Sequence, residues 1–235
     1  MTLIPVRRYG FPYHIKRHVG VKMETEEMGY LEPSYDIVLE DGDLLFQDLT
    51  CRFLCVAIES VTPGYHDADI SHIGIYKQLG NQDYIIEAYP PEVKLTPLPE
   101  FLARAEDDYD RPGVFVGRLK PEYRHLIPAA IDKALSLKGV PYDKAYLSGE
   151  DAYYCSELIV DAFKYANGGN EFFPEQPMSF IDRNTGEVHE YWIRYYSKYL
   201  GMELPVGEPG SSPGHISLSP NIEIVHRYGF LDNWN

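Results

Sequence analysis

Alternating apolar and polar positions predict a β-hairpin over residues 71–89. The segments SHIGIY and YIIEAY alternate in the manner of half-buried strands, and the turn-like segment KQLGNQD separates them. If Gly80 and Asn81 form a two-residue turn, the pairing places Gly74 opposite Glu87. The sequence therefore predicts two antiparallel strands joined by a tight turn.

Shorter apolar runs and helical periodicity predict the remaining elements. Strands are expected at residues 44–46, 114–118 and 222–227. Helices are expected over about 49–59, 100–104, 121–138, 151–167 and 190–200. Pro128 should kink or break the third of these helices. The Pro-rich stretch 90–99 is interpreted as a connection, and the stretch 204–220 as a long loop.

A chain of 235 residues is long enough for one substantial domain. The apolar content of 44% and the charged content of 24% are typical of globular proteins and argue against disorder. Residues 1–40 show no sustained periodicity, so we interpret them as an unassigned N-terminal extension. Residues 41–235 are predicted to form the domain.

The charge balance limits the possible partners. With 21 basic and 36 acidic residues the net charge is −15, which repels nucleic acids, so no nucleic-acid partner is expected. No apolar stretch approaches the roughly 18 residues of a membrane span, and the N-terminal stretch does not resemble a signal peptide. Three cysteines do not suggest a disulfide framework, so we expect a reducing, cytoplasmic location. A leader removed before this form would instead imply a periplasmic or exported protein.

Cys155 is the first candidate for chemistry. It lies near the start of the helix predicted over 151–167, where unpaired backbone N–H groups and the helix dipole favour a thiolate. It also shares an apolar face with Leu158 and Ile159, which is typical of a buried, unreactive cysteine. Taken alone, the residue is better explained by that second interpretation.

The predicted hairpin supplies a base and an orienting group for such a thiol. His72 and Glu87 fall on the same face of the hairpin as diagonal neighbours, and Gly74 leaves the space between them open. A carboxylate so placed can hold an imidazole in one tautomer and stabilise its protonated form. The alternatives are a solvated histidine at a strand end and a surface glutamate.

The other cysteines and histidines give weaker signals. Cys51 and Cys55 are spaced one helical turn apart, but no further ligands lie nearby at metal-binding spacing, so we expect both in the core. The remaining histidines form no HxH or HExxH pattern, and phosphate-binding glycine loops and the GxSxG motif do not occur. No metal and no cofactor are expected.

Several motifs together resemble one enzyme family. They are GDLLF at 42–46, SHIGIY at 71–76, IIEAY at 85–89, GVPYD at 139–143 and YYCSELIV at 153–160, followed by PG and SP elements near 209–220. This set is similar to the YiiX-like branch of the permuted NlpC-type hydrolases, relatives of papain in which the histidine strand precedes the cysteine helix. The resemblance covers most of the chain from residue 41 onward.

The resemblance implies a fold and a role for each residue. The fold would be α+β and papain-like, with an antiparallel sheet packed against the helix that carries the nucleophile. Cys155 would be the nucleophile, His72 the general base and later acid, and Glu87 the residue that orients His72. The backbone N–H of Cys155 would help form the oxyanion hole. Ser71 and Tyr154, next to the catalytic positions, would line the substrate pocket.

The expected reaction is thiolate attack on an amide or ester, giving an acyl-enzyme that water resolves. The substrate could be a small molecule, a peptide, a cell-wall fragment or a lipid amide. Two alternatives remain open. One is a lipid acyltransferase that uses the same thioester chemistry, and the other is a non-catalytic ligand-binding protein on the same fold.

Overall fold

The computed structural model describes residues 37–49, 51, 53–105, 111–149, 151–229 and 231. The chain divides into a unit of residues 1–30 and a unit of residues 31–235, and every described residue belongs to the second unit. Most of the extension predicted over residues 1–40 thus lies outside the described residues. The domain boundary at residue 41 stays a prediction.

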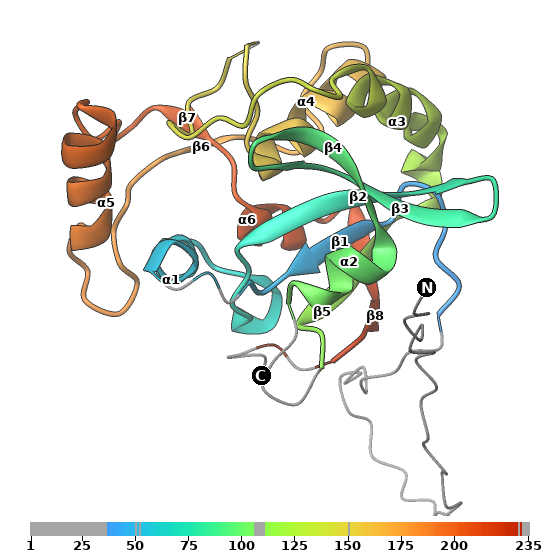
Figure 1. Ribbon diagram of the computed structural model, residues 1–235, viewed down its shortest axis with the longest axis horizontal. Helices are drawn as coiled ribbons and strands as arrows, with labels where there is room; N and C mark the ends of the chain where they lie inside the picture. The colour runs from blue at the N-terminus through green and yellow to red at the C-terminus, as the bar shows by residue number, and fades with distance from the viewer. Residues whose placement is uncertain are drawn as a thin grey trace, which may run out of the picture. The chain divides into compact units, whose positions relative to one another are not determined.

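The described residues build a six-stranded antiparallel sheet with the strand order β4-β3-β2-β1-β5-β8 (Figure 1). The strands predicted near residues 44, 114 and 222 are all confirmed. The bounds are β1 Leu44–Gln47, β2 His72–Leu79, β3 Gln82–Tyr89, β4 Glu92–Pro97, β5 Val114–Leu119 and β8 Ile222–Arg227.

The β2–β3 hairpin has the predicted turn and pairing. Gly80 adopts a φ of 63°, a left-handed conformation that glycine tolerates without a steric penalty. Ile75 pairs with Ile86, and Leu79 pairs with Gln82, as the two-residue turn requires. This register puts His72 and Glu87 on one face of the hairpin, as predicted.

Two helices pack side by side on one face of the sheet (Figure 1). They are α3 (Ile127–Ser136) and α4 (Cys155–Ala166). The apolar side of α4, which includes Leu158, Ile159 and Phe163, joins Ile73 and Ile75 of β2 in the largest buried cluster. Removing this apolar surface from water is the main force that fixes α4 on the sheet. The helix therefore has its N-terminus set by the core beneath it.

The other face of the hairpin is also covered. The short helix α2 (Leu98–Ala103) places Phe101, which is fully buried, against Tyr76 and Ile85. A hairpin buried on both faces shields any polar side chain on it from water. His72 and Glu87 are such side chains.

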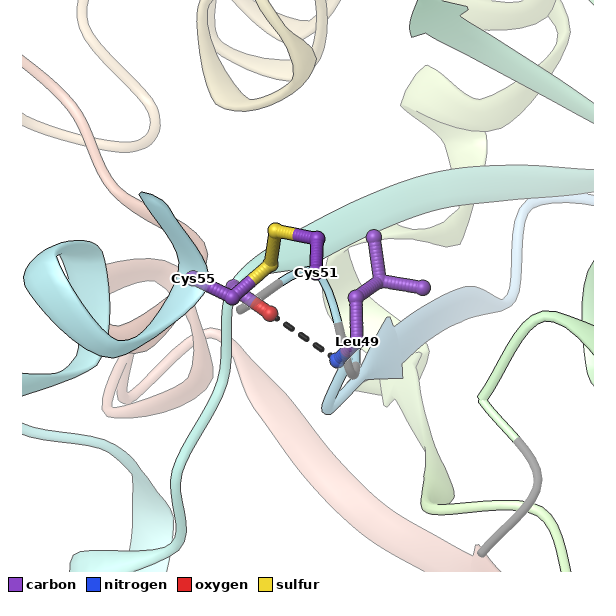
Figure 2. The surroundings of a disulfide bond; sticks show 4 residues. Leu49, Cys51 and Cys55 are labelled. Atoms are coloured by element: carbon purple, nitrogen blue, oxygen red, sulfur yellow. Dashed lines mark hydrogen bonds between the residues drawn. A yellow bond between two sulfur atoms is a disulfide. The ribbon is translucent and has the colours of Figure 1, made fainter. Parts of the chain in front are cut away.

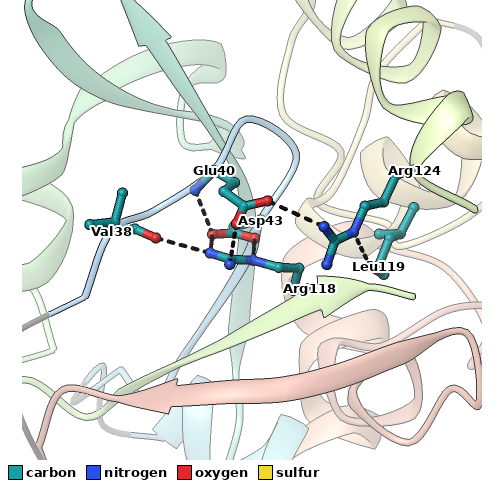
Figure 3. A network of polar contacts seen from close by, with 6 residues as sticks. All are labelled: Val38, Glu40, Asp43, Arg118, Leu119 and Arg124. Atoms are coloured by element: carbon teal, nitrogen blue, oxygen red, sulfur yellow. Dashed lines mark hydrogen bonds and ion pairs between the residues drawn. The ribbon is translucent and has the colours of Figure 1, made fainter. Parts of the chain in front are cut away.

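A polar network fixes the segment that leads into β1 (Figure 3). The guanidinium of Arg118 on β5 donates to both carboxylate oxygens of the buried Asp43, at 2.7 Å each, and to Glu40 at 2.5 Å. Arg118 also donates to the carbonyl of Val38, and Arg124 lies 3.6 Å from Glu40. The two-pronged Arg118–Asp43 pair orients the start of β1, which is the central strand next to β2.

A third buried cluster lies beside the sheet and is mostly aromatic. Trp192 on α5 (Glu190–Arg194) donates from its indole Nε1 to the carbonyl of Ala57 on α1 (Phe53–Val61), at 2.9 Å. Tyr196 on η3 (Tyr195–Leu200) and Phe180 pack against the same indole. These contacts join α1 to α5 on one side of the sheet.

Some elements differ from the predictions. The Pro-rich stretch contains the edge strand β4, and the loop predicted over 204–220 contains β7 (Pro209–Gly210), which pairs with β6 (Gln176–Pro177), and α6 (Pro213–Ser217). The helix predicted over 121–138 is broken near Pro128, as predicted, into the 3-10 helix η2 (Pro121–Leu126) and α3, in which Pro128 is the second residue. A second 3-10 turn, η1, spans Tyr65–Asp67.

Cys51 and Cys55 form a disulfide (Figure 2), so the prediction that both are core thiols is wrong. Cys51 is exposed and precedes α1, because the helix begins only at Phe53, and Cys55 is buried within the helix. The Cα atoms of the two cysteines are 5.3 Å apart, which suits a disulfide. The argument for a reducing compartment from the cysteine count therefore fails, and the location of the protein stays a prediction.

No helix in the described part of the chain has both the length and the apolar character needed to cross a membrane.

Candidate active site

Cys155 is the first residue of α4, and its side chain is 5% exposed. Tyr154 before it is extended, with φ −96° and ψ 171°, so the chain turns sharply into the helix at the cysteine. The buried carboxyl group of Glu157 accepts hydrogen bonds from the N–H groups of Tyr154, at 3.4 Å, and Gly149, at 2.8 Å. Glu157 thereby fixes the segment that delivers Cys155 to the site.

His72 is the first residue of β2 and is 4% exposed, so it is not a solvated histidine. Its Nε2 lies 2.6 Å from Oε2 of Glu87, and the ring also hydrogen-bonds to the side chain of Cys155. Because Nε2 is engaged by the carboxylate, Nδ1 is the ring nitrogen left for the sulfur. The three predicted residues thus meet in series, as thiol, imidazole and carboxylate.

The environment of His72 favours its charged form. Burial alone would lower the pKa of His72, but hydrogen bonds to Cys155 and Glu87 and the negative charge of Glu87 outweigh burial and raise the pKa to about 9. The imidazole is therefore protonated at neutral pH.

Glu87 is fully buried and hydrogen-bonded on both oxygens, so it is not a surface residue. Thr96 on β4 donates to Oε1, while Nη2 of Arg104 lies 2.7 Å from Oε1 and 2.8 Å from Oε2. Burial would raise the pKa of Glu87, but the hydrogen bond and charge of His72, and then those of Arg104, lower it to about 2. The carboxylate stays ionised across the physiological range.

Arg104 and Thr96 are site residues that the sequence reasoning missed. The guanidinium of Arg104 lies 4.1 Å from the centre of the Tyr89 ring, and that ring meets His72 edge-on at 5.5 Å. The available signal was indirect. A glutamate predicted on the same hairpin face as a buried histidine needs a compensating cation, and Arg104 lies at the end of the nearest predicted helix.

The two predicted pocket residues flank the site and line one cavity with Cys155. Ser71 is buried, and its hydroxyl accepts a hydrogen bond from the N–H of Leu49 at 2.9 Å. Tyr154 is also buried, and its hydroxyl accepts a hydrogen bond from the N–H of Ser211 at 3.0 Å. Both side chains therefore help to shape the cavity wall.

That cavity has a volume of about 110 Å³ and a largely apolar lining. Its apolar side chains come from α1, from the segment 177–180, from α5 and from the start of α6. They are Ile58, Val61, Pro177, Met178, Phe180, Trp192 and Pro213. Polar residues also line it, among them Ser156, Ser211, Ser212 and His215. Burial lowers the pKa of His215, so that imidazole is uncharged at neutral pH.

The described residues contain no group of three or more His, Cys, Asp or Glu side chains placed to hold a metal ion. The donor set around Cys155 consists of one sulfur and one imidazole, and that imidazole is engaged by Glu87. This combination does not fit a metal centre.

Comparison with known proteins identifies the family. Residues 38–181 match the sequence profile of the permuted papain-like amidase enzymes of the YaeF/YiiX type, the C92 peptidase family. The chain belongs to this family. The match covers more than half of the chain and includes all three residues of the thiol–imidazole–carboxylate series.

Two relatives agree with this family. The uncharacterized protein YiiX of Escherichia coli strain K12 is 25% identical over 202 residues, which cover 86% of this chain and 93% of YiiX. A crystal structure of metalloprotein yiiX from Escherichia coli O157:H7 superimposes with a TM-score of 0.64 at 25% identity, covering 80% of this chain and 97% of that one. The fold is therefore α+β and permuted papain-like, and the family is one of cysteine amidases.

Proposed function

We propose that the protein is a cysteine amidase in which Cys155 is the nucleophile, His72 the general base and acid, and Glu87 the orienting carboxylate. The observation that carries this proposal is the buried contact series from Cys155 through His72 to Glu87. A nucleophile bonded to a base, which is in turn bonded to an orienting group, is the arrangement that covalent catalysis requires.

In the proposed reaction the sulfur of Cys155 attacks the substrate carbonyl carbon, forming a C–S bond and placing negative charge on the carbonyl oxygen. The N–H groups at the N-terminus of α4 would bind that oxygen. The C–N bond then breaks, and the imidazolium of His72 gives its proton to the leaving amine. Neutral His72 next removes a proton from water, which attacks the thioester carbonyl carbon. The C–S bond then breaks, the acid product leaves, and His72 keeps that proton beside the regenerated thiolate.

Arg104 extends this series by one more charge. With a thiolate at Cys155, charges alternate from the sulfur through His72 and Glu87 to Arg104. Each buried charge then has an opposite neighbour, which offsets the cost of removing it from water. Glu87 can thus stay ionised while it stabilises the imidazolium.

The name of the Escherichia coli structure calls that protein a metalloprotein. Because the residues around Cys155 do not fit a metal centre, we assign no step of this reaction to a metal. All of the proposed chemistry is carried by side chains and by the backbone at the start of α4.

The apolar cavity beside Cys155 favours one alternative, acyl transfer to an acceptor other than water. This reaction shares the acyl-enzyme and differs only in the second nucleophile. Product analysis after single turnover, with and without an added alcohol or amine, distinguishes hydrolysis from transfer. A ligand-binding protein without catalysis would form no acyl-enzyme at all.

The test is the pH profile of iodoacetamide labelling. The sequence has three cysteines, two of which form the disulfide, so Cys155 is the one thiol that can be labelled. We expect rapid labelling at pH 6 in the parent, since the His72 imidazolium favours the thiolate. His72→Ala should label with the profile of an ordinary thiol, near pH ~8.5. His125→Ala, at an exposed histidine of η2, is the matched control.

An identical profile for the parent and His72→Ala would count decisively against the proposed pair. A change in the His125→Ala control would show instead that the profile reports something other than the site.

A further inference from the structure

Gln47, the last residue of β1, has a polar side chain that the proposed reaction does not use. It is fully buried, and in the sheet it pairs directly with His72 of β2. Residues directly opposite each other on antiparallel strands project to the same face, with Cβ atoms about 4.5–5.5 Å apart. The amide of Gln47 therefore lies on the face of the sheet that carries the imidazole of His72 and the carboxylate of Glu87.

The side chain of Gln47 connects β1 to α2. Its Nε2 donates to the main-chain carbonyl of Phe101 at 2.6 Å. The same carbonyl accepts a hydrogen bond from the backbone N–H of Arg104 at 3.4 Å, so both donors meet at one oxygen. The other amide atom of Gln47, Oε1, has no hydrogen-bond partner among the described residues. The amide thus acts through Nε2, on the last turn of α2.

The position of α2 depends on contacts of this kind, because the helix has only six residues. A helix this short is not stable alone in water, and tertiary contacts have to fix it. By contrast, β1 lies in the middle of the sheet and is paired with a strand on either side. The hydrogen bond from Gln47 therefore holds a short peripheral helix against a firmly placed strand.

The last turn of α2 in turn places groups of the catalytic series. The ring centre of Phe101 lies 6.0 Å from that of His72 and 5.2 Å from the guanidinium of Arg104. Arg104 is the first residue after α2, and its Nη2 bonds to both carboxylate oxygens of Glu87. A shift of this turn would therefore move the guanidinium of Arg104 away from Glu87.

We propose that Gln47 is a positioning residue of the catalytic series, which holds the end of α2 so that Arg104 keeps its contact with Glu87. This inference rests on the proposed function and adds to it a residue that acts through Arg104 and not on the substrate. Burying an amide costs free energy, and more so when one of its atoms stays without a partner. The donor to Phe101 is what this amide supplies and an apolar side chain of equal length would not.

The test is the pH at which iodoacetamide labelling of Cys155 fails when the solution is acidified. A guanidinium beside Glu87 favours the ionised carboxylate, so a weaker contact lets Glu87 take up a proton at a higher pH. Gln47→Met keeps the length of the side chain but lacks the donor. In this variant labelling should fail about half a pH unit higher than in the parent, a smaller shift than in Arg104→Met, which removes the guanidinium itself.

A double variant shows whether Gln47 acts through Arg104. In that case, adding Gln47→Met to Arg104→Met should change the pH at which labelling fails by less than about 0.1 unit, because the group that Gln47 positions is already gone. If the two shifts add, Gln47 affects the site by another route and the proposal is wrong.

Asn221→Leu is the matched control, because Nδ2 of Asn221 also donates to a backbone carbonyl, that of Phe172, at 3.0 Å. This variant should lower the midpoint of chemical denaturation without moving the pH at which labelling fails. Gln47→Asn is a second variant with an amide one methylene shorter, which does not reach Phe101. It should shift the pH at which labelling fails in the same direction as Gln47→Met.

The outcomes separate this inference from the proposed function. If the parent labels rapidly at pH 6 but neither Gln47 variant moves the pH at which labelling fails, the positioning role is wrong and the cysteine chemistry stands. An equal shift in Asn221→Leu would also overturn the positioning role, and so would a failure of both Gln47 variants to fold, since the amide would then serve the fold as a whole. If the parent itself does not label rapidly at pH 6, the proposed function fails, whatever the Gln47 variants do.

Discussion

Arg104 holds the carboxylate of Glu87 with one guanidinium nitrogen, Nη2, which lies 2.7 and 2.8 Å from its two oxygens. Glu87 has no exposed surface and also accepts a hydrogen bond from His72. A buried carboxylate between two cations keeps its charge at much lower pH than a carboxylate with one. The Arg104–Glu87 contact therefore sets the lowest pH at which Glu87 stays ionised and paired with His72.

Arg104→Met should make the site fail at a higher pH than in the parent when the solution is acidified. A lowered carboxyl pKa contributes stability above the unfolded value of 4.5, and that stability is lost as the pH falls toward 2. Without Arg104 the pKa of Glu87 rises, so labelling of Cys155 should fail at a pH roughly one unit higher than in the parent. Chemical denaturation at pH 7 should show a free energy of unfolding about 3 kcal/mol lower than in the parent.

Two further variants make this measurement specific. In Arg104→Lys the pH at which labelling fails should return only part of the way to the parent value, because a lysine ammonium lacks the planar guanidinium that lies over the Tyr89 ring. Arg124→Met removes an exposed ion pair and a hydrogen bond to the carbonyl of Leu119, and should lower the free energy of unfolding by no more than about 1 kcal/mol. If labelling of Cys155 fails at the same pH in Arg104→Met as in the parent, Arg104 has no role in holding Glu87 as a carboxylate.

Glu87→Gln should lower the pKa of His72 from about 9 while keeping an oxygen for its Nε2. Burial, which lowers this pKa, is then opposed mainly by the hydrogen bond to Cys155. The imidazolium fraction at pH 7 falls, so hydrolysis should slow by roughly 10²- to 10⁴-fold. Titration of the His72 ring protons by NMR measures the shift directly. The exposed Glu92→Gln is the control, and a His72 pKa that stays near 9 in Glu87→Gln would contradict the assignment.

The sequence was most informative where local rules decide the structure. The Gly80-Asn81 turn sets the register of the hairpin, and the register alone brings His72 and Glu87 onto one face. Helical periodicity and the motif around Cys155 located the other half of the site. A few short-range signals therefore predicted the series of three residues, although they lie far apart in the chain.

The remaining features depend on tertiary context. β4 is an edge strand, where Pro97 can end the ladder without losing a needed hydrogen bond, so its proline content was misleading. The contact between Arg104 and Glu87 forms only once α2 folds over the hairpin. Cys51 and Cys55 have helical spacing, but the helix starts after Cys51, and this start cannot be located from spacing alone.

The disulfide predicts how many cysteines iodoacetamide modifies before and after reduction. Under denaturing conditions without reductant, iodoacetamide should modify one cysteine per chain, Cys155, because Cys51 and Cys55 are bonded to each other. After reduction three cysteines should be modified, and peptide mapping should assign the two new sites to Cys51 and Cys55. Cys51→Ser should leave two reactive thiols without reductant. Three modified cysteines in the unreduced protein, purified under non-reducing conditions, would show that the bond does not form.

The buried carboxyl of Glu157 predicts that the protein loses stability as the pH rises above neutral. Burial raises its pKa to about 8, against the hydrogen bonds from Gly149 and Tyr154 that favour the charged form. Glu59, buried near the negative charge of Asp48, also has a pKa raised to about 8, again mainly by burial. A carboxyl pKa raised on folding contributes stability that is complete below 4.5 and is lost as the pH rises through 8.

Thermal unfolding between pH 5 and pH 9 should therefore show a midpoint that falls on the alkaline side. Glu157→Gln cannot ionise and should flatten this decline, and adding Glu59→Gln should flatten it further. Some slope should persist, because the raised pKa of His72 acts in the same direction between 6.5 and about 9. The exposed Glu122→Gln should leave the slope unchanged. If the double variant declines as steeply as the parent, the two buried carboxyls are not the groups that titrate, and Glu157 must be held as a carboxylate by the N–H groups before Cys155.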